Sequence, residues 1–77
     1  MFDYTVNSKN STTDFKKICN EIEHNLAPNY KGKLLIDVDG STIQEYKKND
    51  KSVVVYNDYE IGAVYVKSDM QLDFVKS

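Results

Sequence analysis

Hydrophobic and polar positions follow two different periods along the first third of this chain. Phe2, Tyr4 and Val6 alternate with polar residues over 2–7, a pattern that is typical of a strand. A polar loop is expected over 8–13. Further along, the apolar positions recur at the spacing of one helical face. The residues on that face are Phe15, Ile18, Cys19, Ile22 and Leu26.

Both ends of the predicted helix carry local signals. Ser11 with Asp14 three residues later is a weak capping-box pattern, and either of the two intervening threonines could cap the helix instead. Pro28 predicts the end of the helix, because it pushes Ala27 out of helical geometry. A connecting loop is expected over 29–32.

A second strand is predicted over 34–39, where a largely apolar segment runs into the dipeptide Asp39-Gly40. Asp-Gly between extended segments is a strong signal for a tight hairpin turn. The returning strand would span 41–48. A short helix over the same residues stays open, because the segment begins with another capping-box pattern.

The second half of the chain is rich in valine and tyrosine, which favour strands. A turn is expected over 49–51. Strands over 52–56 and 61–66, separated by a turn over 57–60, form a predicted hairpin. The tail, 68–77, fits either a further strand or a last helical turn.

These elements follow the order β-α-β-β-β-β. Strands that cluster after one helix predict a mainly antiparallel sheet with the amphipathic helix packed on one face. We expect one α+β domain spanning 1–77, because a chain of 77 residues has room for a single hydrophobic core.

The composition bears on the compartment and the source. Cys19 is the only cysteine, so no intrachain disulfide can form and a reducing compartment is expected. The first residues lack the basic and apolar segments of a signal peptide. No stretch approaches the roughly 20 apolar residues of a membrane span. We therefore expect a cytoplasmic protein without membrane association, and the abundance of Lys, Asn, Asp, Tyr and Ile is typical of an AT-rich bacterial or phage genome.

The charge pattern argues against one class of partner. The net charge is −2, and all ten basic residues are lysines. Arginine supplies the planar fork that recognises phosphate and guanine, so an acidic domain without it is a poor candidate for DNA binding. We do not expect nucleic acid as a partner, although a single-strand binder that stacks bases on tyrosine is kept as a third hypothesis.

One stretch resembles a motif of a known enzyme family. Residues 34–42 form an apolar strand that ends in Asp-x-Asp-Gly-Ser-Thr, similar to the first motif of haloacid-dehalogenase-like phosphatases. The resemblance implies Asp37 as nucleophile and Asp39 as acid/base, with Mg²⁺ alongside. It covers nine residues, and such enzymes need a larger doubly wound sheet than this chain can form. A buried strand followed by an Asp-Gly hairpin explains the same letters, and we favour that interpretation.

The remaining reactive groups do not converge. Cys19 and His24 are five positions apart, so they point about 140° apart around a helix and cannot form a nucleophile pair. Cys19 is expected to act as a small core hydrophobe, and His24 to lie on the surface near the helix C-terminus. We expect no enzymatic activity, no catalytic residue, no metal ion and no cofactor.

The strongest positive signal is a surplus of apolar residues in the late strands. A single helix covers only one face of a sheet, yet valine occupies every position from 53 to 55, so both faces are apolar. The second face would expose a patch of the kind that marks interaction sites, unless the tail or another chain covers it. The patch would include either Tyr65 or Val64 and Val66. The candidate partner-binding residues are Leu35, Asp37, Asp39, Tyr46, Val54, Tyr56, Tyr59 and Tyr65.

These features favour a non-catalytic protein-binding module, such as a small phage or mobile-element inhibitor of a host or defence protein. Acids near the turns, including Asp37 and Asp39, could face a basic site on the partner. The main alternative is a homo-oligomeric structural or ligand-binding protein that associates through its sheet.

Overall fold

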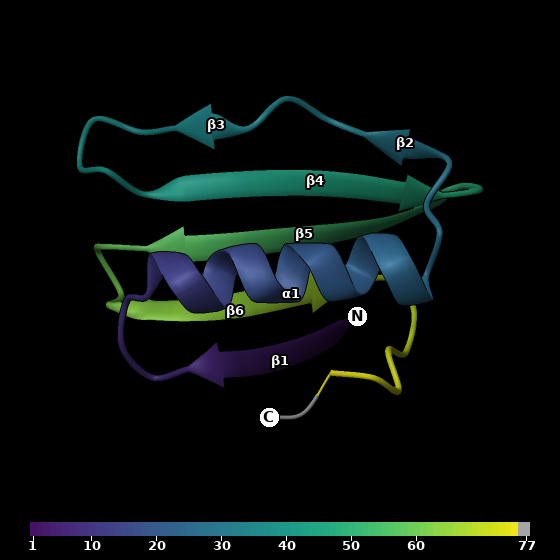
Figure 1. Cartoon of the computed structure of the whole chain (residues 1–77), viewed down its shortest axis with the longest axis horizontal. Helices are drawn as coiled ribbons and strands as arrows, with labels where there is room; N and C mark the ends of the chain where they lie inside the picture. The colour runs from purple at the N-terminus through teal and green to yellow at the C-terminus, as the bar shows by residue number, and fades with distance from the viewer. Residues whose placement is uncertain (76–77) are drawn as a thin grey trace.

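The structure is a computed structural model that describes residues 1–75. One helix lies in front of one antiparallel sheet (Figure 1). In chain order the elements are β1 (Phe2–Asn7), α1 (Thr12–Asn25), β2 (Tyr30–Lys31), β3 (Leu35–Ile36), β4 (Thr42–Lys48), β5 (Lys51–Asp58) and β6 (Ala63–Ser68).

The sheet has the strand order β1-β6-β5-β4-β2, and β3 pairs with the same edge of β4 as β2 does. All of these pairings are antiparallel. The predicted α+β class, with one helix on a mainly antiparallel sheet, is confirmed. Within the described residues, no helix is long and apolar enough to cross a membrane.

Local signals at both ends of α1 act as the sequence predicts. The Ser11 hydroxyl accepts a hydrogen bond from the Asp14 N–H at 3.0 Å, which satisfies one of the free donors of the first turn. At the other end, the Leu26 N–H still donates to the Ile22 carbonyl, but Ala27 turns to a φ of 51° directly before Pro28. The helix therefore begins and ends where capping and proline chemistry place its limits.

The segment 34–39 departs most from its prediction. Its hairpin with 41–48 is confirmed and the helical alternative for 41–48 is wrong, but the first strand is only Leu35–Ile36. Gly40, with a φ of 88°, ends a three-residue loop closed by the Asp37 N–H bond to the Ser41 carbonyl. The expected buried strand is also wrong, since Val38 is fully exposed. Short β2 lies inside the segment 29–32 that was predicted as a loop.

The last hairpin is confirmed with a shifted turn. Strand β6 begins at Ala63 rather than two residues earlier, because the Gly62 N–H donates to the Asp58 carbonyl at 2.7 Å and prolongs the turn. Gly62 adopts a φ of 80° there, a conformation that glycine reaches without strain.

The hydrophobic core lies between α1 and the sheet, and the tail contributes to it. Leu72 and Val75 are buried, and the Leu72 N–H donates to the Tyr4 hydroxyl at 2.8 Å. Over residues 69–75 the tail is neither strand nor helix, so both alternatives are wrong there, and residues 76–77 lie outside the described part. The buried core residues are Phe15, Ile18, Cys19, Ile22, Tyr46, Val53, Val55, Val64, Val66, Leu72 and Val75.

Candidate functional site

The two faces of the sheet have different coverings. Helix α1 and the tail both pack on one face, which we call the helix face. Residues 69–75 of the tail therefore do not cover the second face, contrary to one of the two expectations. Strand β5 shows the division, since Val53 and Val55 are fully buried on the helix face while Val54 and Tyr56 point the other way. We call the second surface the open face.

The open face has a continuous apolar row that crosses the sheet. Cross-strand partners follow one another from β1 to β3, because each pairing joins residues that point to the same side. Neighbours in the row shield one another, so its central side chains are only partly exposed, whereas Leu35 at its end is 58% exposed. The row consists of Thr5, Tyr65, Tyr56, Ile43 and Leu35.

Two tyrosines hold the centre of this row. The rings of Tyr56 and Tyr65 stack with centroids 4.7 Å apart and planes inclined by 15°. The Tyr65 hydroxyl donates a hydrogen bond to the Asp58 carboxylate at 2.9 Å. Partial burial and this bond raise the pKa of Tyr65 to about 12. The two rings thus form a stacked aromatic surface in the chain without a partner, and the bond to Asp58 further positions Tyr65.

Acidic side chains gather at one end of the open face. They line a hollow of about 110 Å³ together with Ile43 and Tyr56. The Tyr59 ring lies beside Gly40 at the same end, and the Tyr59 N–H donates to the Ser41 hydroxyl. We call this region the acidic end and define it by Asp37, Asp39, Asp58 and Glu60.

The carboxylates of the acidic end also stabilise the turns that carry them. Asp39 accepts the Ser41 N–H at 2.9 Å, as expected for an Asp-Gly hairpin. Asp58 accepts from the N–H groups of Glu60 and Ile61. The hydrogen bonds from Tyr65 and from the Ile61 backbone hold the pKa of Asp58 below its ordinary value. The segment that resembles the phosphatase motif therefore forms a hairpin, and the hydrogen bond that Asp39 accepts within the turn explains why an aspartate stands there.

Tyr46 is the one candidate residue that lies on the helix face instead of the open face. It is fully buried on the helix face, where it pairs with Val53, and its hydroxyl donates to the Glu23 carboxylate at 2.6 Å. Glu23 also forms an ion pair with Lys31 at 3.0 Å. Burial, with the bond to Glu23, raises the pKa of Tyr46 well above its ordinary value. Tyr46 is thus a core residue, because β4 turns its even-numbered side chains toward α1.

The structure resolves the other assignments. Tyr65 belongs to the open face, and Val64 and Val66 are core residues. Cys19 is buried, and burial raises the pKa of its thiol. His24 is exposed in the last turn of α1. Across residues 1–75, no group of three or more His, Cys, Asp or Glu side chains is placed to hold a metal ion.

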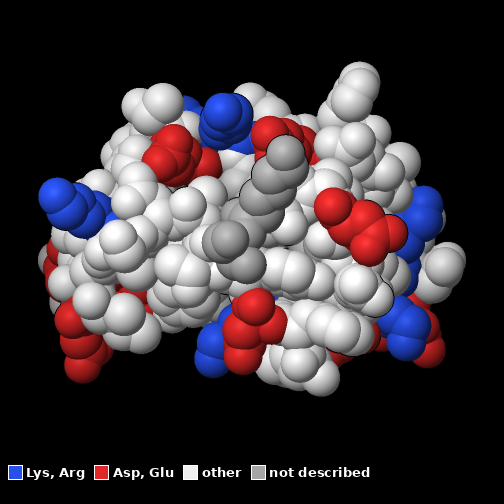
Figure 2. Space-filling view, turned by 90° about the horizontal axis from the view of Figure 1, so that it is seen from below, with Lys and Arg blue, Asp and Glu red and all other residues white. Residues whose placement is uncertain are grey.

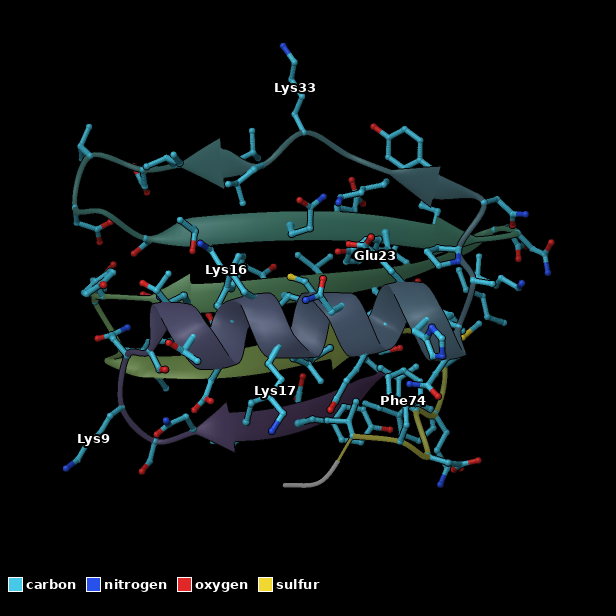
Figure 3. The ribbon with its side chains drawn as sticks, viewed as in Figure 1. Lys9, Lys16, Lys17, Glu23, Lys33 and Phe74 are labelled. Carbon is cyan, nitrogen blue, oxygen red and sulfur yellow. The ribbon has the colours of Figure 1, made fainter. Side chains whose placement is uncertain are left out.

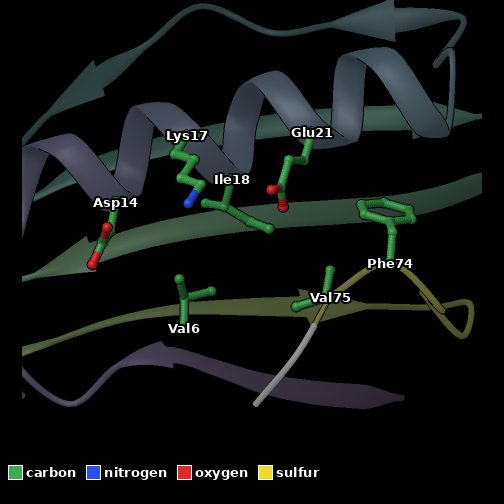
Figure 4. A pocket seen from close by; sticks show the side chains of 7 residues that line it. All are labelled: Val6, Asp14, Lys17, Ile18, Glu21, Phe74 and Val75. Carbon is green, nitrogen blue, oxygen red and sulfur yellow. The ribbon is translucent and has the colours of Figure 1, made fainter.

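A second hollow lies on the other side of the sheet. It measures about 360 Å³ and lies between α1, β1 and the tail, where Lys17 stands between Asp14 and Glu21 above Val6 (Figure 4). Asp14 is already engaged by the Asn7 side chain at 2.6 Å. Seen from the β1 edge, acidic and basic side chains of the described residues are interspersed over the surface (Figure 2). This side therefore offers mixed charge without a preference for one sign.

Sequence reasoning missed one exposed segment. The apolar residues around β3, expected to be buried, are the most exposed apolar run of the described chain: Leu34 is 49%, Ile36 70% and Val38 103% exposed. One feature of the sequence could have revealed this exposure. These residues lie between Gly32 and Asp39-Gly40, so the strand they form is too short for a helix to pack over it.

Comparison with family models, with curated proteins and with solved structures finds no match to this chain. The surfaces of the chain are therefore the features that bear on its function.

Proposed function

We propose that this protein is a non-catalytic protein-binding module that contacts its partner through the open face. The observation that supports the proposal is the ordered row from Tyr65 through Tyr56 and Ile43 to Leu35, on the face to which neither α1 nor the described tail contributes cover. Tyrosine suits such a surface, because its ring buries area while its hydroxyl stays hydrated. Preordered side chains also lose little entropy on binding.

The charges around the row indicate the chemistry of the partner. The acidic end supplies four carboxylates next to the aromatic centre, whereas the row itself is uncharged. A complementary partner would present an apolar patch beside basic side chains, and long-range attraction would speed their encounter. An inhibitor of a host or defence protein that handles nucleic acid fits this chemistry, since the acidic end would occupy a basic site.

A capture experiment with matched variants tests the proposal. Val54→Lys places a charge in the open face, and Asn20→Lys places the same charge on the exposed side of α1. Tagged wild-type protein and Asn20→Lys should recover the same stoichiometric partner from the native host, and Val54→Lys should lose it. Thermal unfolding of both variants checks that they remain folded.

Recovery of no stoichiometric partner would count heavily against the proposal, as would a partner retained by folded Val54→Lys. Raising the salt concentration provides a second readout. It should slow association with the captured partner if the acidic end steers the encounter. Binding of the wild-type protein to a single-stranded oligonucleotide at low salt would instead favour the nucleic-acid hypothesis.

A further inference from the structure

The β3 edge is a second exposed apolar surface, which adjoins the open face at Leu35. Four apolar side chains between residues 34 and 38 are about half or more exposed; two of them form the edge strand β3, and Leu34 and Val38 flank it. An uncovered edge strand of this kind is a template for pairing with another strand. Helix α1 lies over the opposite part of the sheet, so it leaves this edge clear (Figure 1).

Backbone hydrogen-bonding groups point outward along this edge. The Asp37 N–H bonds to the Ser41 carbonyl, so this pair faces β4. Antiparallel pairing alternates, which places Leu35 with Ile43 in the next inward-facing pair. The N–H and C=O groups of Leu34 and Ile36 consequently face away from β4, where a further strand could accept them.

The sequence around Leu35 is antisymmetric in charge. Counting outward from Leu35, Leu34 corresponds to Ile36, Lys33 to Asp37 and Lys31 to Asp39. An antiparallel pair of such segments centred on Leu35 places each lysine opposite an aspartate. Among antiparallel registers, this one alone pairs both lysines with aspartates.

The same register also satisfies the backbone. It sets Leu34 opposite Ile36 of a second copy, and both residues carry outward-facing groups. We propose that the β3 edge binds a second copy of this chain, in an antiparallel pairing centred on Leu35 that joins the two sheets. Charge complementarity selects the second copy over another strand, because this segment supplies both halves of the pattern.

Lys33 supplies most of the electrostatic attraction between the two copies. Its side chain points away from the sheet between β2 and β3 (Figure 3). Lys31 is already paired with Glu23 at 3.0 Å, so it contributes less. The register with β4 shifts by one residue between Lys31 and Leu35, which limits regular pairing to the short segment 34–36, with Lys33 and Asp37 directly at its two ends. The association is therefore weak and needs high protein concentration.

A charge exchange tests the pairing. Lys33→Asp sets like charges against Asp37 of the second copy, and Asp37→Lys sets like charges against Lys33. Sedimentation equilibrium up to concentrations on the order of 1 mM should show wild-type protein approaching the mass of a dimer. Each variant alone should remain monomeric. An equimolar mixture of the two variants should dimerise, because opposite charges face each other again.

The matched control is Lys16→Asp, which changes the charge by the same amount on the exposed side of α1. It should dimerise like the wild type. A second variant, Ile36→Pro, removes an outward N–H that makes no bond to β4, so it should abolish dimerisation while the chain stays folded.

Three results would overturn the inference. One is a wild-type protein that stays monomeric throughout this concentration range, and another is a mixture of the charge variants that stays monomeric. The third is a dimer that survives Ile36→Pro but dissociates with Val54→Lys, since that would assign self-association to the open face. The inference does not depend on the proposed function, because capture of a different protein by the open face leaves sedimentation of the purified chain unchanged.

Discussion

The two faces of the sheet are built from the same strands, yet α1 covers one of them and leaves the other in contact with solvent. Val53, Val54 and Val55 are consecutive, but the first and third are fully buried beneath α1 while the second meets solvent. On the helix face the residues are mainly aliphatic and removed from water. On the open face, tyrosines and partly exposed aliphatic residues lie beside charged side chains, including Glu45 and Lys67, the cross-strand partners of Val54. Residue type in a strand therefore does not identify the core; the position of the helix does.

The largest expected difference in stability between the two faces comes from truncating one isoleucine on each. Ile22→Ala should lower the free energy of unfolding by about 2–5 kcal/mol, because it leaves a cavity beneath α1. Ile43→Ala on the open face should lower it by about 1–2 kcal/mol, because water fills the space and only the transfer term is lost. Urea unfolding of both variants measures the difference, and equal losses would show that the open face is covered in solution.

A smaller effect separates two neighbouring valines. Val55→Thr introduces a hydroxyl into the core and should destabilise the protein by about 1–3 kcal/mol. Val54→Thr keeps its hydroxyl in contact with water and should change stability by no more than about 0.5 kcal/mol. Thermal unfolding compares the two. A large loss for Val54→Thr would contradict the assignment of that side chain to the solvent.

Removing a tyrosine hydroxyl from each face should give a still smaller difference in the free energy of unfolding. Tyr46→Phe removes the bond to Glu23 and should lower the free energy of unfolding by about 1 kcal/mol, since the partly exposed carboxylate can bind water instead. Tyr56→Phe should have almost no effect, because the Tyr56 hydroxyl makes no hydrogen bond within residues 1–75. Reversal of this order in urea unfolding would exclude the proposed role of the Tyr46 bond.

The pH dependence of stability tests the hydroxyl–carboxylate pair that Tyr65 and Asp58 form on the open face. The pKa of Tyr65, raised to about 12, lies above the ordinary tyrosine value of about 10. Its contribution to stability is therefore complete below pH 10 and is lost as the pH rises toward 12. Asp58 has a lowered pKa, so its contribution is present above about pH 4 and is lost as the pH falls through the folded-state value.

Tyrosine ring resonances, followed by NMR against pH, measure these shifts. Asp58→Asn should move the Tyr65 midpoint down toward the ordinary value, whereas Asp39→Asn should leave it in place. An unchanged Tyr65 midpoint in Asp58→Asn would show that the pair does not form in solution.

Local chemistry explains which predictions from the sequence succeeded. Three predictions that each depend on a few adjacent residues were confirmed: the apolar periodicity of α1, the Ser11 cap and the Asp39-Gly40 turn. Seven of the eight candidate residues lie on the open face or at its acidic end, because alternation in the strands is also a local property. Their role in binding stays a prediction.

The errors came from relations across the sheet. The side of β4 that meets α1 depends on which face the helix selects, so Tyr46 was assigned to the wrong surface. The short β2 and β3 depend on pairing with β4, which no local pattern reveals. The tail packs beside α1 through Leu72, a contact decided by space left next to the helix.

The pairing of β1 with β6 has a consequence for synthesis. Strands β4, β5 and β6 follow one another directly, so they can pair as soon as they leave the ribosome. Residues 2–7 must wait until residues 63–68 emerge, because β6 is the neighbour that they need. Strand β1 therefore joins the sheet only after β6 has been made, and until then its apolar residues remain unpaired in the growing chain.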